Sequence, residues 1–182
     1  MTLKLVKPSK KYLQAFLKAW DDYKQDTNRF KHVDITPLER ALESNNVDGF
    51  FKQIENNERG INLPDGYVPS TTFWLMDDDD WVGSFSIRHQ LTPKLEQMGG
   101  HIAVNISPKY RGKYSSFVGI KMCMVKAHKL GLKRVLMTCD ENNRASFRAI
   151  MGLMKLYGGE QLPDTIVDGH GEHRVWVNTA RK

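Results

Sequence analysis

The spacing of hydrophobic residues predicts helices in the first part of the chain. Between residues 9 and 23 they recur three and four positions apart, which is the period of an amphipathic helix. Ser9 is a suitable cap for this helix, and Thr36 followed by Pro37 is typical of the start of a second one. Residues 56–69 are rich in Asn, Gly and Pro, so we interpret them as a loop.

Strand patterns precede the first helix and follow the loop. Leu3–Val6 is expected to be a short strand, and the runs 71–76 and 81–88 are rich in β-branched and aromatic residues. Four aspartates, 77–80, separate these two runs. Adjacent carboxylates favour a solvated turn, so we expect a hairpin, with a divalent cation on two of them as the less favoured alternative. Residues 99–106 alternate as the next strand.

The last part of the chain alternates between helix and strand patterns. The expected elements are a helix at 115–130, a buried strand at 134–139, a helix that begins at Asn143, and strands at 159–162 and 174–178 joined by a loop with Pro163 and Gly169. A strand, a crossover helix and a further strand make a βαβ unit. The sequence therefore predicts an α/β fold.

Composition fits one soluble domain. Of the 182 residues, 40% are hydrophobic and 26% are charged, which is enough apolar material for one core, so we treat 1–182 as a single domain. No apolar run approaches the roughly 20 residues that cross a bilayer, and the charged N-terminus is unlike a signal peptide. We expect a cytoplasmic protein with no membrane partner.

The cysteines and histidines form no metal-binding pattern. Cys123 and Cys139 stand in apolar surroundings, so we expect buried, reduced thiols. His170 and His173 fall in what reads as a turn and the start of a strand, with no zinc-type spacing to other ligands. We therefore expect no metal cofactor.

A formal net charge of +6 and a pI of about 9.3 indicate an anionic ligand. A nucleic acid and a phosphorylated cofactor both suit this charge. The basic residues are scattered along the chain, and no RNP, KH, zinc-finger or helix-turn-helix pattern occurs in it. A basic nucleic-acid-binding module is therefore the weakest functional alternative, and we expect no specific nucleic-acid partner.

The segment Arg111–Ser116 is the strongest candidate for a ligand site. It leaves an expected strand and opens an expected helix, where backbone N–H groups lack helical partners and the helix dipole is positive. Arg111 and Lys113 add charge, and Ser115 and Ser116 add small hydroxyl groups. Such a turn suits a pyrophosphate, although a solvated helix start without any ligand is the plain alternative.

This segment, Arg111-Gly112-Lys113-Tyr114-Ser115-Ser116, resembles the acetyl-CoA signature of the GNAT superfamily, Gln/Arg-x-x-Gly-x-Gly/Ala. The likeness continues through residues 127–136 and 138–146, and residues 68–75 and 99–102 are similar to a bacterial branch of predicted acetyltransferases. The resemblance implies a seven-stranded mixed sheet with helices on both faces. In that sheet the strand with Ile106 and the strand with Val135 would be parallel and splayed apart.

The resemblance also implies where acetyl-CoA, as co-substrate, would bind. The acetyl-pantetheine arm would lie between the splayed strands and contact main-chain groups of Asn105 and Ile106. The pyrophosphate would rest on Lys113–Ser116, and Asn143 would contact the pantetheine or order the loop beside it. An amine presented from the opposite side would attack the thioester directly.

Two positions depart from the family pattern in ways that affect cofactor binding and proton transfer. Tyr114 stands in place of the loop glycine, and a side chain restricts both the backbone and its approach to a phosphate. Ile150 stands where many members carry a tyrosine that protonates the leaving thiolate, so Ser146 or water would serve instead.

A third departure concerns the general base. Gly99 and Gly100 stand where some members carry a glutamate, so His89 and His101 are weak catalytic candidates, and a water chain is an equal alternative. We expect an N-acetyltransferase that moves acetyl from acetyl-CoA to a primary amine of a small molecule or peptide. A degenerate acetyl-CoA-binding domain without turnover is the main alternative, and a homodimer stays open.

Overall fold

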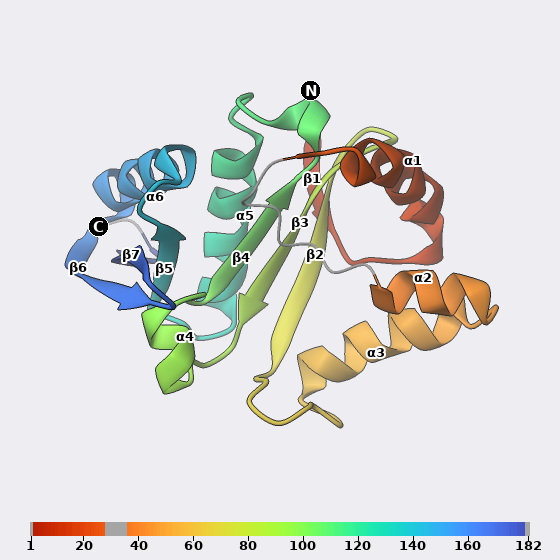
Figure 1. The fold of residues 1–182 in the computed structure, drawn as a ribbon, viewed down its shortest axis with the longest axis horizontal. Coiled ribbons are helices and arrows are strands. Elements are labelled where there is room, and N and C mark those ends of the chain that lie inside the picture. The colour runs from red at the N-terminus through yellow and green to blue at the C-terminus, as the bar shows by residue number, and fades with distance from the viewer. Residues whose placement is uncertain (1, 28–35, 181–182) are drawn as a thin grey trace.

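The computed structural model describes residues 2–27 and 36–180 (Figure 1). The helices are α1 Leu13–Lys24, α2 Thr36–Glu43, α3 Val47–Arg59, α4 Pro93–Gln97, α5 Ser115–Lys129 and α6 Arg144–Tyr157, with 3-10 turns at Lys10–Tyr12 and Pro108–Tyr110. The strands are β1 Leu3–Val6, β2 Ser70–Asp77, β3 Asp80–Arg88, β4 Ile102–Ile106, β5 Arg134–Asp140, β6 Gly159–Val167 and β7 His170–Asn178.

The strands of the described residues form two sheets. One has the order β1-β2-β3-β4 and the other β5-β7-β6, and every paired neighbour is antiparallel. Figure 1 shows the two sheets side by side, with the edge strands β4 and β5 facing each other. The expected mixed α/β fold is confirmed, but hydrogen bonding divides the expected seven-stranded sheet into four and three strands.

Most elements lie where the sequence predicts them, with exceptions in the helical N-terminal part. Helix α3 and the short helix α4 were not expected, and the residues after Asn56 that we interpreted as loop begin inside α3. In the described chain the Ser9 side chain makes no capping bond; a 3-10 turn closes instead through Tyr12 N–H to Ser9 C=O, 3.0 Å. The two last strands are longer than expected: β6 continues past Pro163, which lies at a register shift between Leu162 and Thr165, and β7 already begins at His170.

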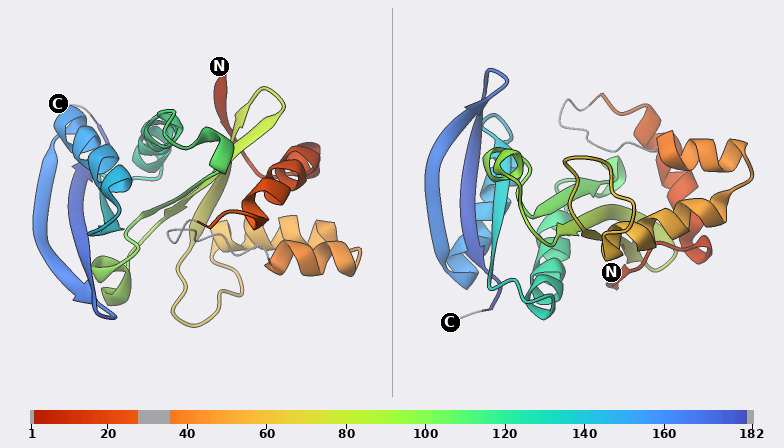
Figure 2. Two further views of the ribbon diagram at one scale, coloured as in Figure 1. Left: turned by 45° about the horizontal axis from the view of Figure 1, so that its top comes forward. Right: turned by 90° about the horizontal axis from the view of Figure 1, so that it is seen from below.

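The four-stranded sheet separates two hydrophobic cores, as the alternation along β2 shows. Phe73 and Leu75 pack in the larger core with α5 and α6, whereas Trp74 and Met76 pack in a second core with α1, α2 and α3. Figure 2 shows these helix groups on opposite sides of the sheet. Helices therefore cover both faces, as expected.

Helix α5 approaches the sheet closely through a glycine. A Cβ on Gly119 would lie 2.1 Å from the ring of Phe85, which is fully buried on β3. Cys123 and Cys139 are buried in the same core with free thiols. None of the helices described is long and apolar enough to cross a membrane.

Candidate functional site

Helix α5 begins without a side-chain cap. Its N-cap residue, Tyr114, makes no capping hydrogen bond through its side chain in the described chain. The N–H of Val118 donates to the carbonyl of Tyr114 at 3.0 Å, so the amides of Ser115, Ser116 and Phe117 precede the first bond of the helix. The start of α5 thus presents a set of backbone donors at the positive end of a 15-residue helix.

The hydroxyl of Ser115 strengthens this arrangement. Ser115 is 1% exposed, and its Oγ has no hydrogen-bond partner among the described residues. Burying a hydroxyl without a partner is unfavourable, and native proteins seldom leave such a group unpaired. The structure therefore places an unsatisfied polar atom beside the first amides of the helix, which lack partners within it.

Tyr114 adopts the backbone conformation that glycine favours. Its φ is 60° and its ψ is 3°, in the left-handed region, and Gly112 two residues earlier has a φ of 72°. The side chain of Tyr114 is turned away from the protein and the residue is 79% exposed. The loop thus keeps a glycine-like backbone although it carries a tyrosine, at some strain.

A charged cluster supports the loop from the β2–β3 hairpin. The Tyr110 hydroxyl donates to Asp80 at 2.8 Å, and Lys109 Nζ lies 2.5 Å from the same carboxylate. Hydrogen bonds from Lys109 and then Tyr110 hold the pKa of Asp80 below its ordinary value. Lys113 Nζ lies 5.6 Å from the centroid of the Tyr110 ring. The hairpin expected from the aspartates is confirmed, and Asp80 connects this hairpin to Lys109 and Tyr110 in the loop before α5.

Arg111 braces the loop from the other side. Its guanidinium lies 2.7 Å from the carboxylate of Asp26, and its Nε donates to the carbonyl of Ile106 at 3.1 Å. The Asp26 side chain is only 10% exposed, so this ion pair is largely shielded from water. Arg111 therefore links the end of β4 to the segment after α1, and its side chain has a structural role.

The two edges of β4 differ. Along the β3 edge, Ser84 pairs with Asn105, and Ser107 N–H donates to the carbonyl of Val82 at 2.9 Å. Bonded groups alternate along an antiparallel strand, so the main-chain groups of Asn105 face β3, whereas those of Ile106 face the other edge. The open edge thus offers main-chain groups on alternate residues.

The two sheets meet at the start of β4. His101 N–H donates to the carbonyl of Leu136 at 2.7 Å, and Leu136 N–H donates to His101 Nδ1 at 3.0 Å. Gly100 has a φ of 54°, and a Cβ there would lie 2.4 Å from the Leu136 carbonyl oxygen. The Arg88 guanidinium donates to the carbonyls of Gly99 and Gly100, both at 2.8 Å. Backbone contact, which glycine permits, therefore fixes this junction.

The geometry gives His101 a structural position. Burial, together with the positive charge of Arg88, lowers the pKa of His101 to about 4. The imidazole is therefore neutral near pH 7, with Nδ1 occupied as acceptor for Leu136 N–H. Protonation would remove that acceptor. Since the folded-state pKa lies below the ordinary value, His101 destabilises the fold as the pH falls from about 6.5 toward 4.

His89 and Asn143 lie at other points of the fold. His89 follows β3, where its Nε2 lies 2.9 Å from Thr71 Oγ1, and burial lowers its pKa. Asn143 caps α6, because its Oδ1 accepts from Ser146 N–H at 3.1 Å. The structure thus brings the predicted residues 105–106 and 111–116 together around the start of α5, while His89 lies beyond the far end of β3.

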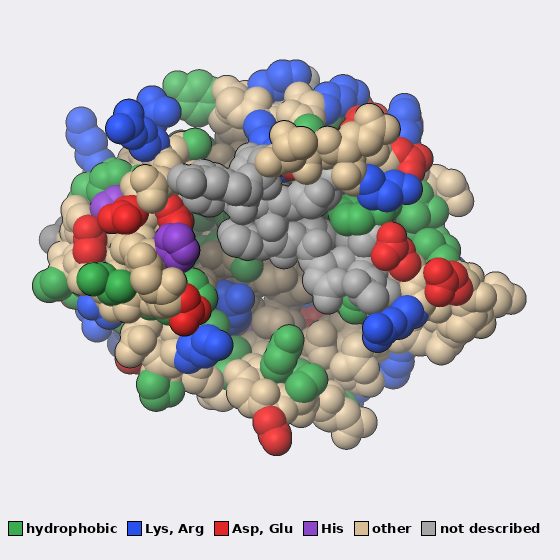
Figure 3. Space-filling model, viewed as in Figure 1, with side chains coloured by type: hydrophobic (Ala, Val, Ile, Leu, Met, Phe, Trp, Pro, Cys, Tyr) green, Lys and Arg blue, Asp and Glu red, His purple; other side chains and the backbone are tan. Residues whose placement is uncertain are grey.

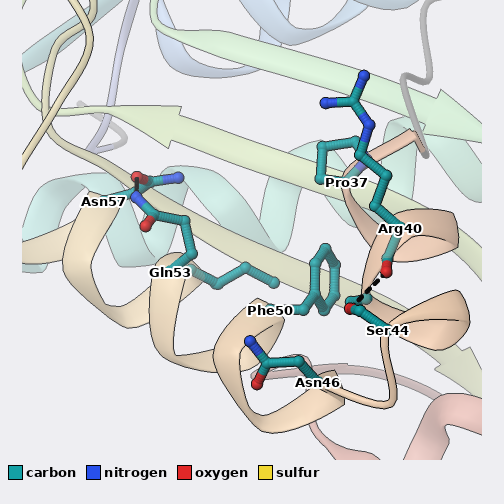
Figure 4. Close-up of a pocket in the computed structure, with 9 residues that line it drawn as sticks. Pro37, Arg40, Ser44, Asn46, Phe50, Gln53 and Asn57 are labelled. Atoms are coloured by element: carbon teal, nitrogen blue, oxygen red, sulfur yellow. Dashed lines mark hydrogen bonds between the residues drawn. The ribbon is translucent and has the colours of Figure 1, made fainter.

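A separate cavity lies between α2 and α3 (Figure 4). It has a volume of about 390 Å³, and Arg40, Phe50 and Gln53 are among its lining residues. Its described lining includes none of the residues predicted to bind cofactor. On the face seen in Figure 3, Lys and Arg side chains gather along the upper rim. We therefore place the candidate ligand site at α5 and treat the cavity as unrelated to it.

Comparisons with known proteins support the assignment of the fold. No family model matches the chain, and no curated protein matches it in sequence. A ribosomal alpha-N-protein acetyltransferase in complex with coenzyme A has a TM-score of 0.63 at 12% identity, covering 99% of this chain and 96% of its own. A GNAT-family acetyltransferase from Streptococcus pneumoniae has a TM-score of 0.60 at 12% identity, covering 97% and 99%.

A chimera of the spermidine N-acetyltransferase SpeG from Vibrio cholerae and hSSAT has a TM-score of 0.60 at 11% identity, covering 98% of this chain and 97% of its own. The chain therefore has the fold of the GNAT acetyltransferases over nearly its whole length.

Proposed function

We propose that the chain is a GNAT-type N-acetyltransferase that moves the acetyl group of acetyl-CoA to a primary amine. The observation that carries this proposal is the buried, unpartnered Ser115 hydroxyl beside the uncapped amides of α5. An unsatisfied hydroxyl and the first amides of a helix suit the oxygens of a pyrophosphate. Lys113 contributes positive charge to the same loop, so the donor set fits a phosphorylated cofactor.

In this proposal the loop and the open edge of β4 hold the two parts of acetyl-CoA. The amides of Lys113–Ser116 would receive the pyrophosphate, and main-chain groups of Ile106 would lie along the pantetheine arm. The main-chain groups of Ile106 lie on the edge that faces β5, whereas those of Asn105 face β3, so the proposal assigns the main-chain contact to Ile106 and not to the predicted Asn105. We also propose that β4 and β5 run parallel and splay from the junction at His101.

The protonation state of the two cysteines favours direct transfer of the acetyl group to the amine. Acetyl-CoA, when bound, supplies an acetyl group activated as a thioester. Burial raises the pKa of Cys123 and of Cys139 to about 12, so neither is a thiolate near neutral pH. An acetyl-cysteine intermediate is therefore unfavourable, and the amine itself is the expected nucleophile.

The second candidate is an acetyl-CoA-binding domain without turnover. Ile150 is 5% exposed in the core of α6, so the position that donates a proton in many relatives carries a buried alkyl group here. Tyr114, which stands where the family has glycine, supports the same alternative. Turnover then depends on whether water or Ser146 can protonate the leaving thiolate, which is a tolerable leaving group without help.

A coupled assay tests both candidates. Purified protein is incubated with acetyl-CoA and, in turn, polyamines, amino acids, aminoglycosides and peptides, and the release of free thiol is measured. Amine-dependent thiol release supports the acetyltransferase, whereas acetyl-CoA binding without release by any acceptor supports the binding domain. If acetyl-CoA does not bind, both candidates are wrong.

A further inference from the structure

Glu172 on β7 is a buried carboxylate with an unsatisfied oxygen. The residue is 7% exposed, and its Oε2 has no hydrogen-bond partner in the part of the chain that is described. The Thr138 hydroxyl donates to the carboxylate, while burial raises the pKa of Glu172 above its ordinary value. A buried carboxylate is strongly unfavourable unless a cation or several donors compensate it.

Among the described residues no Lys or Arg side chain is seen to compensate Glu172, and only His173, the smallest of the effects on its pKa, favours the ionised carboxylate. Arg174 lies two residues along β7 on the same face, but its guanidinium donates to the carbonyl of Pro163 at 3.0 Å and to that of Glu96 at 3.4 Å. His173 points to the other face, where its Nδ1 lies 3.0 Å from Asp164. The residue opposite on β5 is Asp140, which adds negative charge.

Glu172 lies close to the junction of the two sheets. Thr138, which donates to Glu172, also accepts a hydrogen bond from the N–H of Gly99 at 2.8 Å. Gly99 and Gly100 lie just before His101 and β4 and contribute no side chains there. The Thr138 hydroxyl therefore links the Glu172 carboxylate to the residues just before β4.

We propose that Glu172 recognises the acceptor by binding the ammonium of a cationic amine. This inference rests on the proposed acetyltransferase function and assigns it a substrate class, amines that carry a positive charge at neutral pH. The ammonium would supply the charge and the hydrogen-bond donor that Oε2 lacks. An ion pair formed at such a buried site is strong, because water does not screen it.

The same physics predicts opposite effects of Glu172 on stability and on binding. Since the folded-state pKa is raised, ionised Glu172 destabilises the free protein at neutral pH, and stability is regained as the pH falls through that pKa. Glu172→Gln removes the charge and keeps the shape. We expect the variant to melt at a higher temperature than the wild type while it loses affinity for amines. If Glu172 had only a structural role, Glu172→Gln would change the melting temperature without weakening amine binding.

The test measures amine binding and acetyl-CoA binding separately. Saturation-transfer NMR with spermidine, free lysine and a short peptide with a free N-terminus reports amine binding without turnover. We expect Glu172→Gln to weaken the binding of the amine that the wild type binds by roughly thirtyfold or more, and Glu172→Asp to restore part of it. The acetyl-CoA melting shift should be the same in all three proteins, so its loss would point to the proposed function and not to Glu172.

Glu160→Gln is the matched control. Glu160 is on the neighbouring strand β6, where it is largely exposed and pairs with Arg134 at 3.1 Å. This variant should bind amines as the wild type does. The inference is overturned if Glu172→Gln binds the three amines as tightly as the wild type, or if the wild type binds none of them.

Discussion

Helices α5 and α6 both follow a strand, but they differ in the cap of their first amides and in the charges of the residues before them. At α6, Asn143 Oδ1 accepts from Ser146 N–H at 3.1 Å, and the preceding turn carries the acidic Asp140 and Glu141. At α5 the N-cap is Tyr114, which provides no side-chain cap in the described structure, and the preceding turn carries Arg111 and Lys113.

The first amides of α6 therefore have an acceptor within the chain, whereas those of α5 suit an acceptor from a ligand. The turn before α6 supplies its own acceptor and negative charge to the positive end of the helix. The turn before α5 instead carries Lys113, the first amides of the helix and the buried, unpartnered Ser115 hydroxyl, while Arg111 pairs with Asp26. An external anion would suit the amides, the hydroxyl and Lys113 together, which is why we propose that the pyrophosphate binds there.

The largest effect is expected when a negative charge is built into the α5 site. Ser115→Asp places a carboxylate where the pyrophosphate should bind, so repulsion and competition for the amides should lower acetyl-CoA affinity roughly a hundredfold, about 2.8 kcal/mol. Isothermal titration calorimetry measures this loss, with circular dichroism to verify the fold. Ala145→Asp, an acid at the exposed start of α6, is the control and should leave the affinity unchanged.

Removal of the Ser115 hydroxyl is a milder test of the same site. Ser115→Ala deletes a buried group that has no partner among the described residues, so the free protein should be no less stable than the wild type. A hydrogen bond to a charged group contributes about 1.5–3 kcal/mol, so acetyl-CoA should bind roughly tenfold more weakly. Calorimetric titration and urea unfolding measure the two quantities. Unchanged affinity would mean that this hydroxyl does not meet the ligand.

Removal of the cap of α6 should have the opposite effect on stability to the removal of the Ser115 hydroxyl. Asn143→Ala removes the acceptor of Ser146 N–H and leaves that amide unsatisfied, which should lower the free energy of unfolding by about 1 kcal/mol. Urea unfolding at pH 7 measures it, compared directly with Ser115→Ala. Equal stability losses in the two variants would contradict the distinction between the two helix starts.

The smallest effect is expected at Tyr114. With a φ of 60°, Tyr114→Gly relieves left-handed strain, which offsets the greater freedom that glycine gives the unfolded chain. The net gain in stability should be below about 1 kcal/mol, and acetyl-CoA should bind at least as tightly. Thermal melting and titration are measured separately. Loss of binding in a folded variant would show that the Tyr114 ring itself contacts the ligand.

The strand, the turn and the helix start around Tyr114 could be predicted from the sequence because their signals are local. A strand, a basic turn and a helix start are adjacent in the chain, so the hydrophobic period and the charges place them together without knowledge of the tertiary structure. The conformation of Tyr114 was not predictable in the same way. Its φ of 60° is imposed by the loop, and the residue type alone argues against it.

Features that depend on packing between distant segments could not be predicted from the sequence. The division into two sheets, and the contact of Gly100 with Leu136 where they meet, are visible only in three dimensions. Helix α3 was not predicted, and only its last residues, 56–59, were interpreted as loop because of their Asn and Gly content; Asn46 caps the helix by accepting from the N–H of Gly49 at 3.0 Å. Glu172 falls in a stretch that we interpreted as a turn and strand start, and nothing in the sequence indicates its burial.

Thermal melting with and without acetyl-CoA tests the central claim most directly. A ligand that binds only the folded state should add about 2.7 kcal/mol of stability at a hundred times its dissociation constant, a rise of roughly 5–10 °C for a chain of this size. ATP at the same concentration is the control for general binding of phosphates. We expect a rise with acetyl-CoA that ATP does not match. An unchanged melting temperature, or an equal rise with ATP, would contradict an acetyl-CoA site at the start of α5.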